Sequence, residues 1–129
     1  MAGRDTRPTD LTAMDEARPG QRVRIYIGEH DHAAGAHRPL WEELLLLLRD
    51  EGAAGATMFR GLAGFGAHSH LHLARVADLV PDLPVVVEWI DTPEQVDRLL
   101  PMLQARVSMG LITVDDVTIA HFRPRQPNP

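Results

Sequence analysis

The segment from Arg60 to His72 offers more chemistry than any other, because closely spaced glycines precede alternating histidines there. Its glycines are Gly61, Gly64 and Gly66. Glycine tolerates backbone conformations that other residues avoid, so successive amide groups can form a concave anion site to which Arg60 adds charge. The spacing does not match the dinucleotide-binding fingerprint, in which a helix begins within the glycines. Two predictions stay open: an anion-binding loop, or a mobile or tightly turning loop without a ligand.

The histidines of this segment are a candidate metal site. His68, His70 and His72 alternate, so an extended chain points all three imidazoles to one side. Neutral imidazoles with an open fourth position can hold zinc, nickel or copper. The alternative is a solvated polar loop. A looser histidine group between residues 30 and 37 also follows a predicted strand and can meet the first group at one rim.

The residues that could act in catalysis do not form a recognisable set. Ser69 lies between two histidines, but no glycine-flanked nucleophile elbow surrounds it. Asp115 and Asp116 are adjacent, so in a strand their side chains point to opposite faces and cannot act together as acid and base. The sequence therefore does not predict an enzyme.

The composition excludes several classes of protein. The 129 residues include no cysteine, which rules out disulfides, thiolate metal sites and iron–sulfur clusters. All 13 basic residues are arginine, so there is no lysine for a Walker A loop or a Schiff base. The net charge of -5 and the isoelectric point near 5.7 argue against a general nucleic-acid binder. Any bound anion must be held by arginine, histidine or backbone amides.

The chain shows no signal for export or for membrane insertion. Its first residues lead into acidic and proline-containing sequence rather than an apolar region, and no stretch approaches the length of a membrane span. We therefore expect a cytoplasmic protein without direct membrane insertion.

About a hundred residues are expected to fold, between disordered tails at 1–21 and 123–129. Apolar alternation and valine runs predict strands at 22–27, 56–60, 83–90 and 114–122. Helical periodicity, with proline near each start and glycine near each end, predicts helices from 39 to 52 and from 92 to 110. The first contains five consecutive leucines, so it either lies between two layers or reaches another subunit. Pro101 is expected to kink the second.

The order of these elements predicts an α+β domain. Strand, helix, strand, strand, helix and strand form the ferredoxin-like βαββαβ arrangement, in which both helices cover one face of a four-stranded antiparallel sheet. The other face, which includes Tyr26 and Phe122, remains bare. Folds of this kind often bury such a face by forming oligomers.

The chain resembles the domain-of-unknown-function 190 (DUF190) family of PII-like proteins over about residues 22–122. The resemblance rests on separate blocks in the same order. They are Arg24-Ile25-Tyr26-Ile27-Gly28-Glu29, Arg38-Pro39-Leu40, Gly52-Ala53-Ala54-Gly55-Ala56-Thr57, Arg60-Gly61-Leu62-Ala63-Gly64-Phe65-Gly66 with His72, Asp82-Leu83-Pro84-Val85-Val86-Val87-Glu88 and Gly110-Leu111-Ile112-Thr113-Val114-Asp115-Asp116-Val117.

The resemblance implies a homotrimeric signalling protein that binds a small adenine-type nucleotide in clefts between subunits. Residues 61–82 would be the long loop that reports the nucleotide to a transporter, channel or enzyme, and no nucleic acid would be involved. Residues 110–116 would face the base of this loop across the cleft. The nucleotide-binding residues would be Arg60, Gly61, Gly64, Phe65, Gly66, Gly28, Glu29, Arg38 and Gly110.

Two departures from PII proteins sharpen these expectations. PII proteins carry basic residues in the turn before the last strand, whereas residues 109–113 contain none, so a monophosphate, a diphosphate or a cyclic nucleotide is easier to accommodate than a triphosphate. The only tyrosine, Tyr26, lies on the first strand and not in the loop. The alternative function is a metal-binding or metal-tolerance protein that uses His68, His70 and His72 on the same trimeric scaffold.

Overall fold

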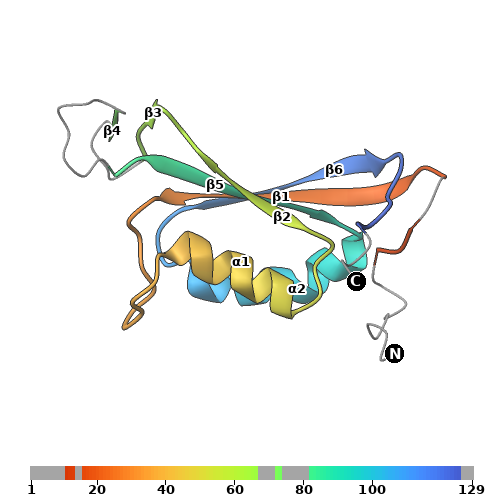
Figure 1. Ribbon diagram of the computed structural model, residues 1–129, viewed down its shortest axis with the longest axis horizontal. Coiled ribbons are helices and arrows are strands. Elements are labelled where there is room, and N and C mark those ends of the chain that lie inside the picture. Colours follow the sequence, from red (N-terminus) through yellow and green to blue (C-terminus); the bar gives the residue numbers. More distant parts are fainter. Residues whose placement is uncertain (1–10, 14–15, 67–71, 74–81, 126–129) are drawn as a thin grey trace.

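The computed structural model of this chain describes residues 11–13, 16–66, 72–73 and 82–125. Two helices lie on one side of a four-stranded sheet, below it in Figure 1. A separate two-stranded sheet lies at the left-hand end of that view. In chain order the elements are β1 (Arg18–Gly28), α1 (Leu40–Asp50), β2 (Ala56–Arg60), β3 (Ala63–Gly64), β4 (His72–Leu73), β5 (Pro84–Asp91), α2 (Pro93–Arg106) and β6 (Leu111–Ile119).

The topology of the large sheet confirms the predicted ferredoxin-like α+β class. Its strand order is β2-β5-β1-β6, and every neighbouring pair is antiparallel. β5 and β1 are therefore the central strands, and β2 and β6 are the edges. Ile25 of β1, for example, pairs with Val87 of β5 on one side and with Ile112 of β6 on the other.

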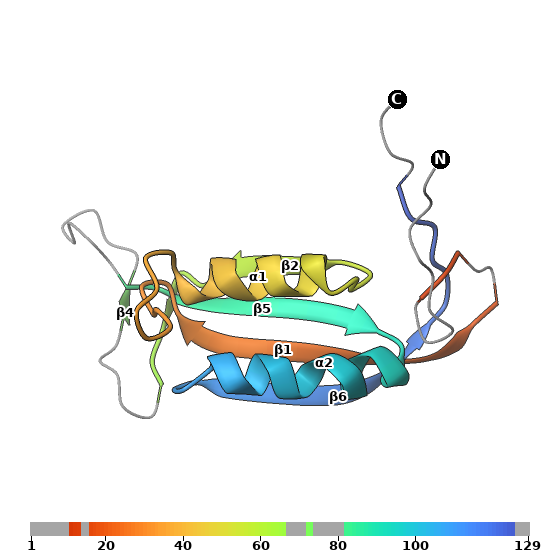
Figure 2. The same cartoon turned by 90° about the horizontal axis from the view of Figure 1, so that it is seen from below.

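The hydrophobic core lies between the sheet and the two helices. The buried residues of β1 follow the predicted alternation and are Val23, Ile25 and Ile27. The valine run of β5 favours burial on both faces, but the strand also buries alternate residues, Val85, Val87 and Trp89. Figure 2 shows α1 beside β5 and β2, and α2 beside β1, so each helix covers its own part of this apolar face.

The leucine run of α1 contacts more than one layer. Leu44, Leu47 and Leu48 are buried against the sheet, and Leu45 packs partly against the same core. Leu46 instead lines a groove between α1 and α2. Because the helix contacts both the sheet and its neighbouring helix, it is apolar on more than one side.

The helix ends follow the predicted signals, with two differences. The Thr92 hydroxyl caps α2 by accepting a hydrogen bond from the Gln95 backbone N–H, and Pro93 is the first helical residue. Pro101 lies inside α2, which continues to Arg106. The helix ends there and not at Gly110. Pro39 precedes the first residue of α1 rather than lying inside its first turn.

The outer ends of β1 and β6 differ from the sequence prediction. β1 begins at Arg18, inside the segment predicted as a disordered tail, because Arg18 pairs with Ile119 and extends the ladder with β6. Gly20 permits this contact, since a Cβ at that position would overlap the Ile119 side chain. β6 correspondingly runs over Leu111–Ile119, three residues earlier than predicted.

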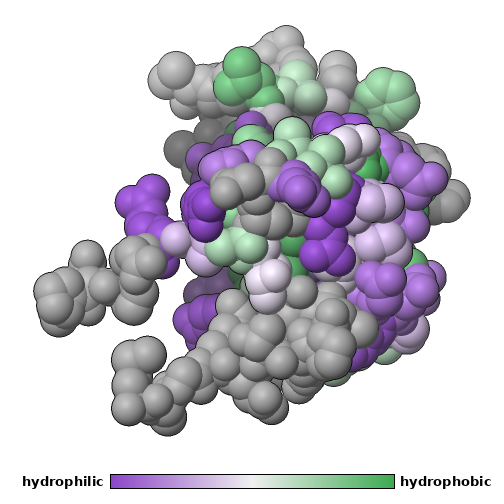
Figure 3. All heavy atoms as spheres, turned by 90° about the vertical axis from the view of Figure 1, so that its right-hand side faces the viewer, coloured by the Kyte–Doolittle hydropathy of each residue, from purple (hydrophilic) through white to green (hydrophobic). Residues whose placement is uncertain are grey.

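A buried carboxylate lies at the end of β5 where α2 begins. Asp91 is fully buried and accepts hydrogen bonds from the Trp89 indole (3.0 Å) and from the backbone N–H groups of Ala54 and Thr92 (2.9 Å each). These donors compensate for the burial of its charge. Seen from this end of the molecule, hydrophilic side chains surround smaller hydrophobic areas (Figure 3).

Neither helix of the described chain combines the length and the apolar composition that crossing a membrane requires.

Candidate functional site

Several predicted site residues meet at one end of the large sheet, on the left in Figure 1. At this end β2 finishes with Arg60, β5 starts with Pro84 and β1 finishes with Gly28. β6 starts beside them at Leu111, directly after Gly110. The strand order thus places the base of the 61–82 segment next to the end of β1.

Pro84 lies at the centre of this arrangement, and its ring packs against two of the glycines, Gly61 and Gly64. It pairs with Gly28 across the sheet, and its carbonyl accepts a 2.7 Å hydrogen bond from the Gly61 N–H. A Cβ on Gly61 would lie 2.9 Å from the Pro84 ring, and one on Gly64 would lie 3.0 Å from it. A side chain at Gly61 would therefore force the Pro84 ring to shift, and one at Gly64 would crowd the same ring.

The anion-binding role of these glycines stays a prediction, and the structure describes the backbone conformation of Gly61 and Gly64. Among the described glycines, positive φ values occur at Gly35, Gly52 and Gly110, and not at Gly61 or Gly64. The Gly61 amide is engaged with Pro84, and Gly64 pairs with His72 between β3 and β4. In this conformation, the Arg60 guanidinium is the group at the start of the segment that can bind an anion.

Arg60 forms an ion pair with Glu29. Arg60 Nε lies 2.6 Å from Glu29 Oε2, and the two side chains differ in exposure, 57% for Arg60 against 16% for Glu29. That carboxylate oxygen is buried, and no described group makes a hydrogen bond to it. The pair therefore presents a mostly exposed cation to solvent and keeps the anion behind it.

The turn that carries Glu29 is fixed by two further carboxylates. The Asp31 carboxylate accepts a hydrogen bond from the Gly28 N–H (2.8 Å), and the Asp82 carboxylate accepts one from the His30 N–H (2.9 Å). A Cβ on Gly28 would lie 2.9 Å from Asp31 Oδ1 and 3.2 Å from Asp82 Oδ1, so both carboxylates pack closely against this glycine. Sequence reasoning missed the roles of Asp31 and Asp82, although aspartate is one of the residue types that favour turns.

The remaining predicted nucleotide-binding residues occupy different places. Phe65 is 77% exposed. Gly110 has a φ of 150° and lies against β1, where a Cβ would be 2.8 Å from the Tyr26 carbonyl oxygen. Arg38 lines the groove between α1 and α2, which has a volume of about 580 Å³ and also contains Glu42 and Arg106. Gly66 is exposed at the limit of the described segment.

The predicted metal site falls largely outside the described residues. His68 and His70 lie in the part of the segment that is not described, and for His72 only the backbone pairing with Gly64 is defined. Within the described ranges, no group of three histidine or acidic side chains is placed to hold a metal ion. In the second histidine group, His30 Nδ1 lies 3.9 Å from Asp82 Oδ1.

The face of the sheet opposite the helices carries a row of apolar side chains next to the candidate site. The register places four residues, one from each strand, side by side in this row: Phe59, Val86, Tyr26 and Leu111. Phe59 is 52% exposed and Leu111 57%. An apolar row of this width on an uncovered sheet face is typical of a surface that another chain covers.

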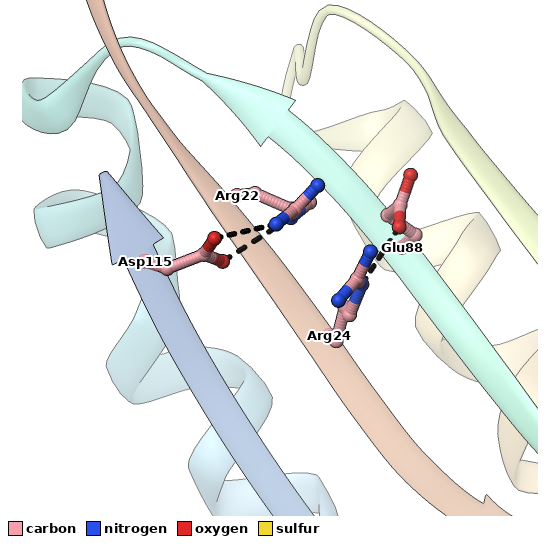
Figure 4. Close-up of polar contacts among 4 residues, drawn as sticks. All are labelled: Arg22, Arg24, Glu88 and Asp115. Atoms are coloured by element: carbon pink, nitrogen blue, oxygen red, sulfur yellow. Dashed lines mark hydrogen bonds and ion pairs between the residues drawn. The ribbon is translucent and has the colours of Figure 1, made fainter. Parts of the chain in front are cut away.

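Further along the same face, two arginines of β1 pair with carboxylates on its neighbours (Figure 4). Arg22 makes two hydrogen bonds to Asp115, of 2.6 and 3.2 Å, and Arg24 donates one of 2.9 Å to Glu88. The hydrogen bonds from Arg22 lower the pKa of the Asp115 carboxyl below its usual value. The hydrogen bond to Glu88 raises the pKa of Arg24. These pairs leave the face polar at one end and apolar at the end near Arg60.

Comparison with known proteins identifies relatives in sequence. The model of the DUF190 family, described as "Uncharacterized ACR, COG1993", matches residues 20–119. A UPF0166 protein of Aquifex aeolicus is 34% identical over 100 residues, which cover 78% of this chain and 92% of that protein. A UPF0166 protein of Methanocaldococcus jannaschii is 30% identical over 95 residues, which cover 73% and 85% of the two chains.

Solved structures share the fold. CPII, a nitrogen regulatory PII-like protein from Thiomonas intermedia K12 bound to ADP, AMP and bicarbonate, aligns with a TM-score of 0.56 at 23% identity over 81% of this chain and 98% of its own. A candidate PII-like signalling protein from Thermus thermophilus aligns with a TM-score of 0.55 at 19% identity over 81% and 92% of the two chains. At these identities the similarity demonstrates a PII-like fold.

Proposed function

This chain belongs to the DUF190 family, and on that premise we propose that it is a non-enzymatic, PII-like signalling protein that binds an adenine-type nucleotide. The nucleotide is reported to a partner through residues 61–82. The observation that carries the proposal is the position of Arg60. Its exposed guanidinium lies at the end of β2 where that segment begins, beside the ends of β1 and β5.

The roots of the 61–82 segment support a reporting role, because both are tied to the strand ends around Arg60. Gly61 donates its N–H to the Pro84 carbonyl, and Asp82 accepts a hydrogen bond from the His30 N–H. A phosphate that draws the Arg60 guanidinium towards itself would therefore act directly on the start of the segment. Ordering or reorientation of a segment by such contacts is a common switching device.

The chemistry of the site favours a nucleotide of low charge. The positive charge of Arg60 is partly offset by Glu29 at 2.6 Å, and the turn at 109–113 adds no basic residue. The structure of CPII with ADP and AMP supports an adenine nucleotide as the ligand class for this fold. We propose a monophosphate, diphosphate or cyclic nucleotide, held by Arg60 with contributions from the segment around Gly64, Phe65 and Gly66.

We propose a homotrimer as the functional assembly, with the nucleotide in clefts between subunits. The apolar row formed by Phe59, Val86, Tyr26 and Leu111 supplies a surface for that contact, since it lies on the sheet face opposite the helices. Burial of such a row in a symmetric assembly removes apolar area from water. The partner that reads the 61–82 segment would be a transporter, a channel or an enzyme.

Isothermal titration calorimetry tests the nucleotide proposal. The purified protein is first shown to be folded and trimeric by circular dichroism and analytical ultracentrifugation, and is then titrated with AMP, ADP, ATP and cyclic AMP. We expect binding of at least one low-charge nucleotide, and a loss of about tenfold or more in affinity in Arg60→Gln, because one charge-assisted phosphate contact is removed.

Arg49→Gln is the matched control, because Arg49 is an exposed arginine at the other end of α1 that pairs with Asp50. It changes the net charge by the same amount and should leave the affinity unchanged. A folded trimer that binds none of the four nucleotides would refute the proposed function.

A further inference from the structure

We infer that Glu29 determines which nucleotides the site accepts, by offsetting the charge of Arg60 so that ligands with little negative charge are favoured. The inference rests on the proposed nucleotide site and assigns it a specificity residue. It follows from the burial of Glu29 and from the way the neighbouring backbone holds it.

Glu29 lies where an anionic ligand cannot avoid its charge. Its carboxylate is mostly buried, 2.6 Å behind the exposed Arg60 guanidinium, so a phosphate that approaches this cation from solvent also approaches the carboxylate. Within the described chain nothing donates a hydrogen bond to the buried Oε2 atom, so the contact with Arg60 is an ion pair without hydrogen-bond geometry. The N–H groups of Arg60 therefore remain available to a ligand while its net charge is reduced.

The backbone that carries Glu29 is held in place by hydrogen bonds. The Glu29 backbone N–H donates a 2.8 Å hydrogen bond to the Leu83 carbonyl. On either side of it, the Gly28 N–H is bound by Asp31 and the His30 N–H by Asp82. Because three consecutive backbone amides are engaged, the Glu29 side chain starts from a fixed point beside Arg60.

The surrounding charge strengthens the discrimination. Two further carboxylates lie against the turn that carries Glu29, because Asp31 accepts a hydrogen bond from the Gly28 N–H and Asp82 accepts one from the His30 N–H. Each additional phosphate charge on the ligand adds repulsion from Glu29, and this repulsion offsets most of the additional attraction to Arg60 because the two opposite charges lie 2.6 Å apart. ATP should therefore be disfavoured relative to ADP, and ADP relative to AMP.

Titration of Glu29→Gln with AMP, ADP and ATP in the absence of magnesium tests this inference. The substitution keeps the side-chain shape and removes one negative charge. We expect affinity to rise in the order of ligand charge, by about threefold for AMP and about tenfold for ATP, as removal of one like charge at a few ångströms in a partly solvated site predicts. Asp50→Asn is the matched control, since it removes one exposed carboxylate at the C-terminal end of α1.

The wild-type protein gives an independent measurement that needs no variant. Salt screens repulsion between ligand and carboxylates, so the ratio of ATP affinity to AMP affinity should rise as sodium chloride is increased from about 50 to about 300 mM. A ratio that falls with salt contradicts the inference.

The outcomes separate this inference from the proposed function. If the wild type binds nucleotides and Glu29→Gln changes all three affinities equally, or weakens them, the role of Glu29 is overturned and the nucleotide site stands. If neither protein binds any nucleotide while both are folded trimers, the proposed function and the inference are both overturned.

Discussion

A buried carboxylate lies at each end of β5, and the two differ in the hydrogen bonds that they accept. At its C-terminal end, Asp91 accepts three hydrogen bonds from groups of the same chain, including the Trp89 indole. At its N-terminal end, beside Pro84, the buried Glu29 oxygen has an arginine at 2.6 Å but no hydrogen bond from the described residues. The Asp91 carboxylate therefore stabilises the fold through its hydrogen bonds, whereas the Glu29 carboxylate acts mainly through its charge on Arg60.

The Asp91 end is reinforced by a second polar cluster. The buried Gln95 side chain donates to the Gly52 carbonyl at 3.3 Å and accepts from Arg98 at 2.8 Å. Arg98 in turn donates to the Glu51 carbonyl at 2.6 Å. These contacts join the end of α1 to the start of α2. At the Arg60 end, the hydrogen bonds hold the backbone of the strand ends, while the exposed cation and the apolar row face solvent.

The largest effect is expected from removing the carboxylate of Asp91. Asp91→Ala leaves the Trp89 indole and two backbone N–H groups without their acceptor in a buried site, which should lower the free energy of unfolding by about 2–4 kcal/mol. Urea denaturation followed by circular dichroism measures the change. Asp97→Ala, an exposed acidic position on α2, is the control and should alter stability by less than about 0.5 kcal/mol. A loss for Asp91→Ala as small as that of the control would mean that the two ends do not differ in this way.

The next effect concerns the apolar row near Arg60. Leu111→Glu should weaken formation of the proposed trimer by at least about tenfold in the dissociation constant, because it would bury a charge at the proposed contact between subunits. Sedimentation equilibrium measures the dissociation constant. Leu62→Glu is the control, since Leu62 is also a highly exposed leucine but lies outside the row. Equal assembly by both variants would show that the row does not form the subunit contact.

The Pro84 contact supplies a smaller effect on stability. Gly61→Ala would place a Cβ 2.9 Å from the Pro84 ring and should cost about 1–3 kcal/mol, as overpacking of a tight contact does. Gly55→Ala is the matched control, because nothing lies within 4 Å of the position that its Cβ would occupy. Urea denaturation of both variants gives the difference. The cost should shrink when Pro84→Ala is combined with Gly61→Ala, and a cost that persists in the double variant would exclude the ring as its cause.

The sequence was sufficient to predict most of the fold, because the fold depends on local patterns. Alternation in 22–27, the valine run before Trp89 and the proline and threonine at the start of α2 each specify an element independently of the rest of the chain. The strand over 18–21 was missed for the opposite reason. Its sequence has no apolar alternation, and it is held by pairing with β6 at Val117 and Ile119, which only the folded register reveals.

The candidate site could be predicted only in part, because it joins residues that are distant in the sequence. The sequence identifies Arg60 and Gly61 as candidates because of their residue types. The structure shows that Gly61 is favoured by the nearby Pro84 ring, which is distant in the sequence, and not by a positive φ. The contact between Glu29 and Arg60 depends on where β1 and β2 end relative to each other. No spacing rule connects such positions, so the sequence predicts the candidates and the topology determines which of them meet.

The smallest effect on stability is expected from the exposed ion pair between Arg22 and Asp115, in contrast to the buried carboxylate of Asp91. Hydrogen bonds from Arg22 lower the pKa of Asp115 in the folded protein, so this pair adds stability above the pKa of the unfolded carboxyl and loses it as the pH falls through the folded pKa. Asp115→Asn should therefore reduce stability slightly at pH 7, because an exposed pair contributes little. The difference in the free energy of unfolding between wild type and variant, measured by urea denaturation, should vanish when the pH is below the lowered pKa of Asp115 in the folded protein. Asp116→Asn is the control, because the Asp116 carboxylate accepts a hydrogen bond from Gln21 instead of an arginine. A difference that stays constant between acidic and neutral pH would show that the Arg22 contact does not depend on the charge of Asp115.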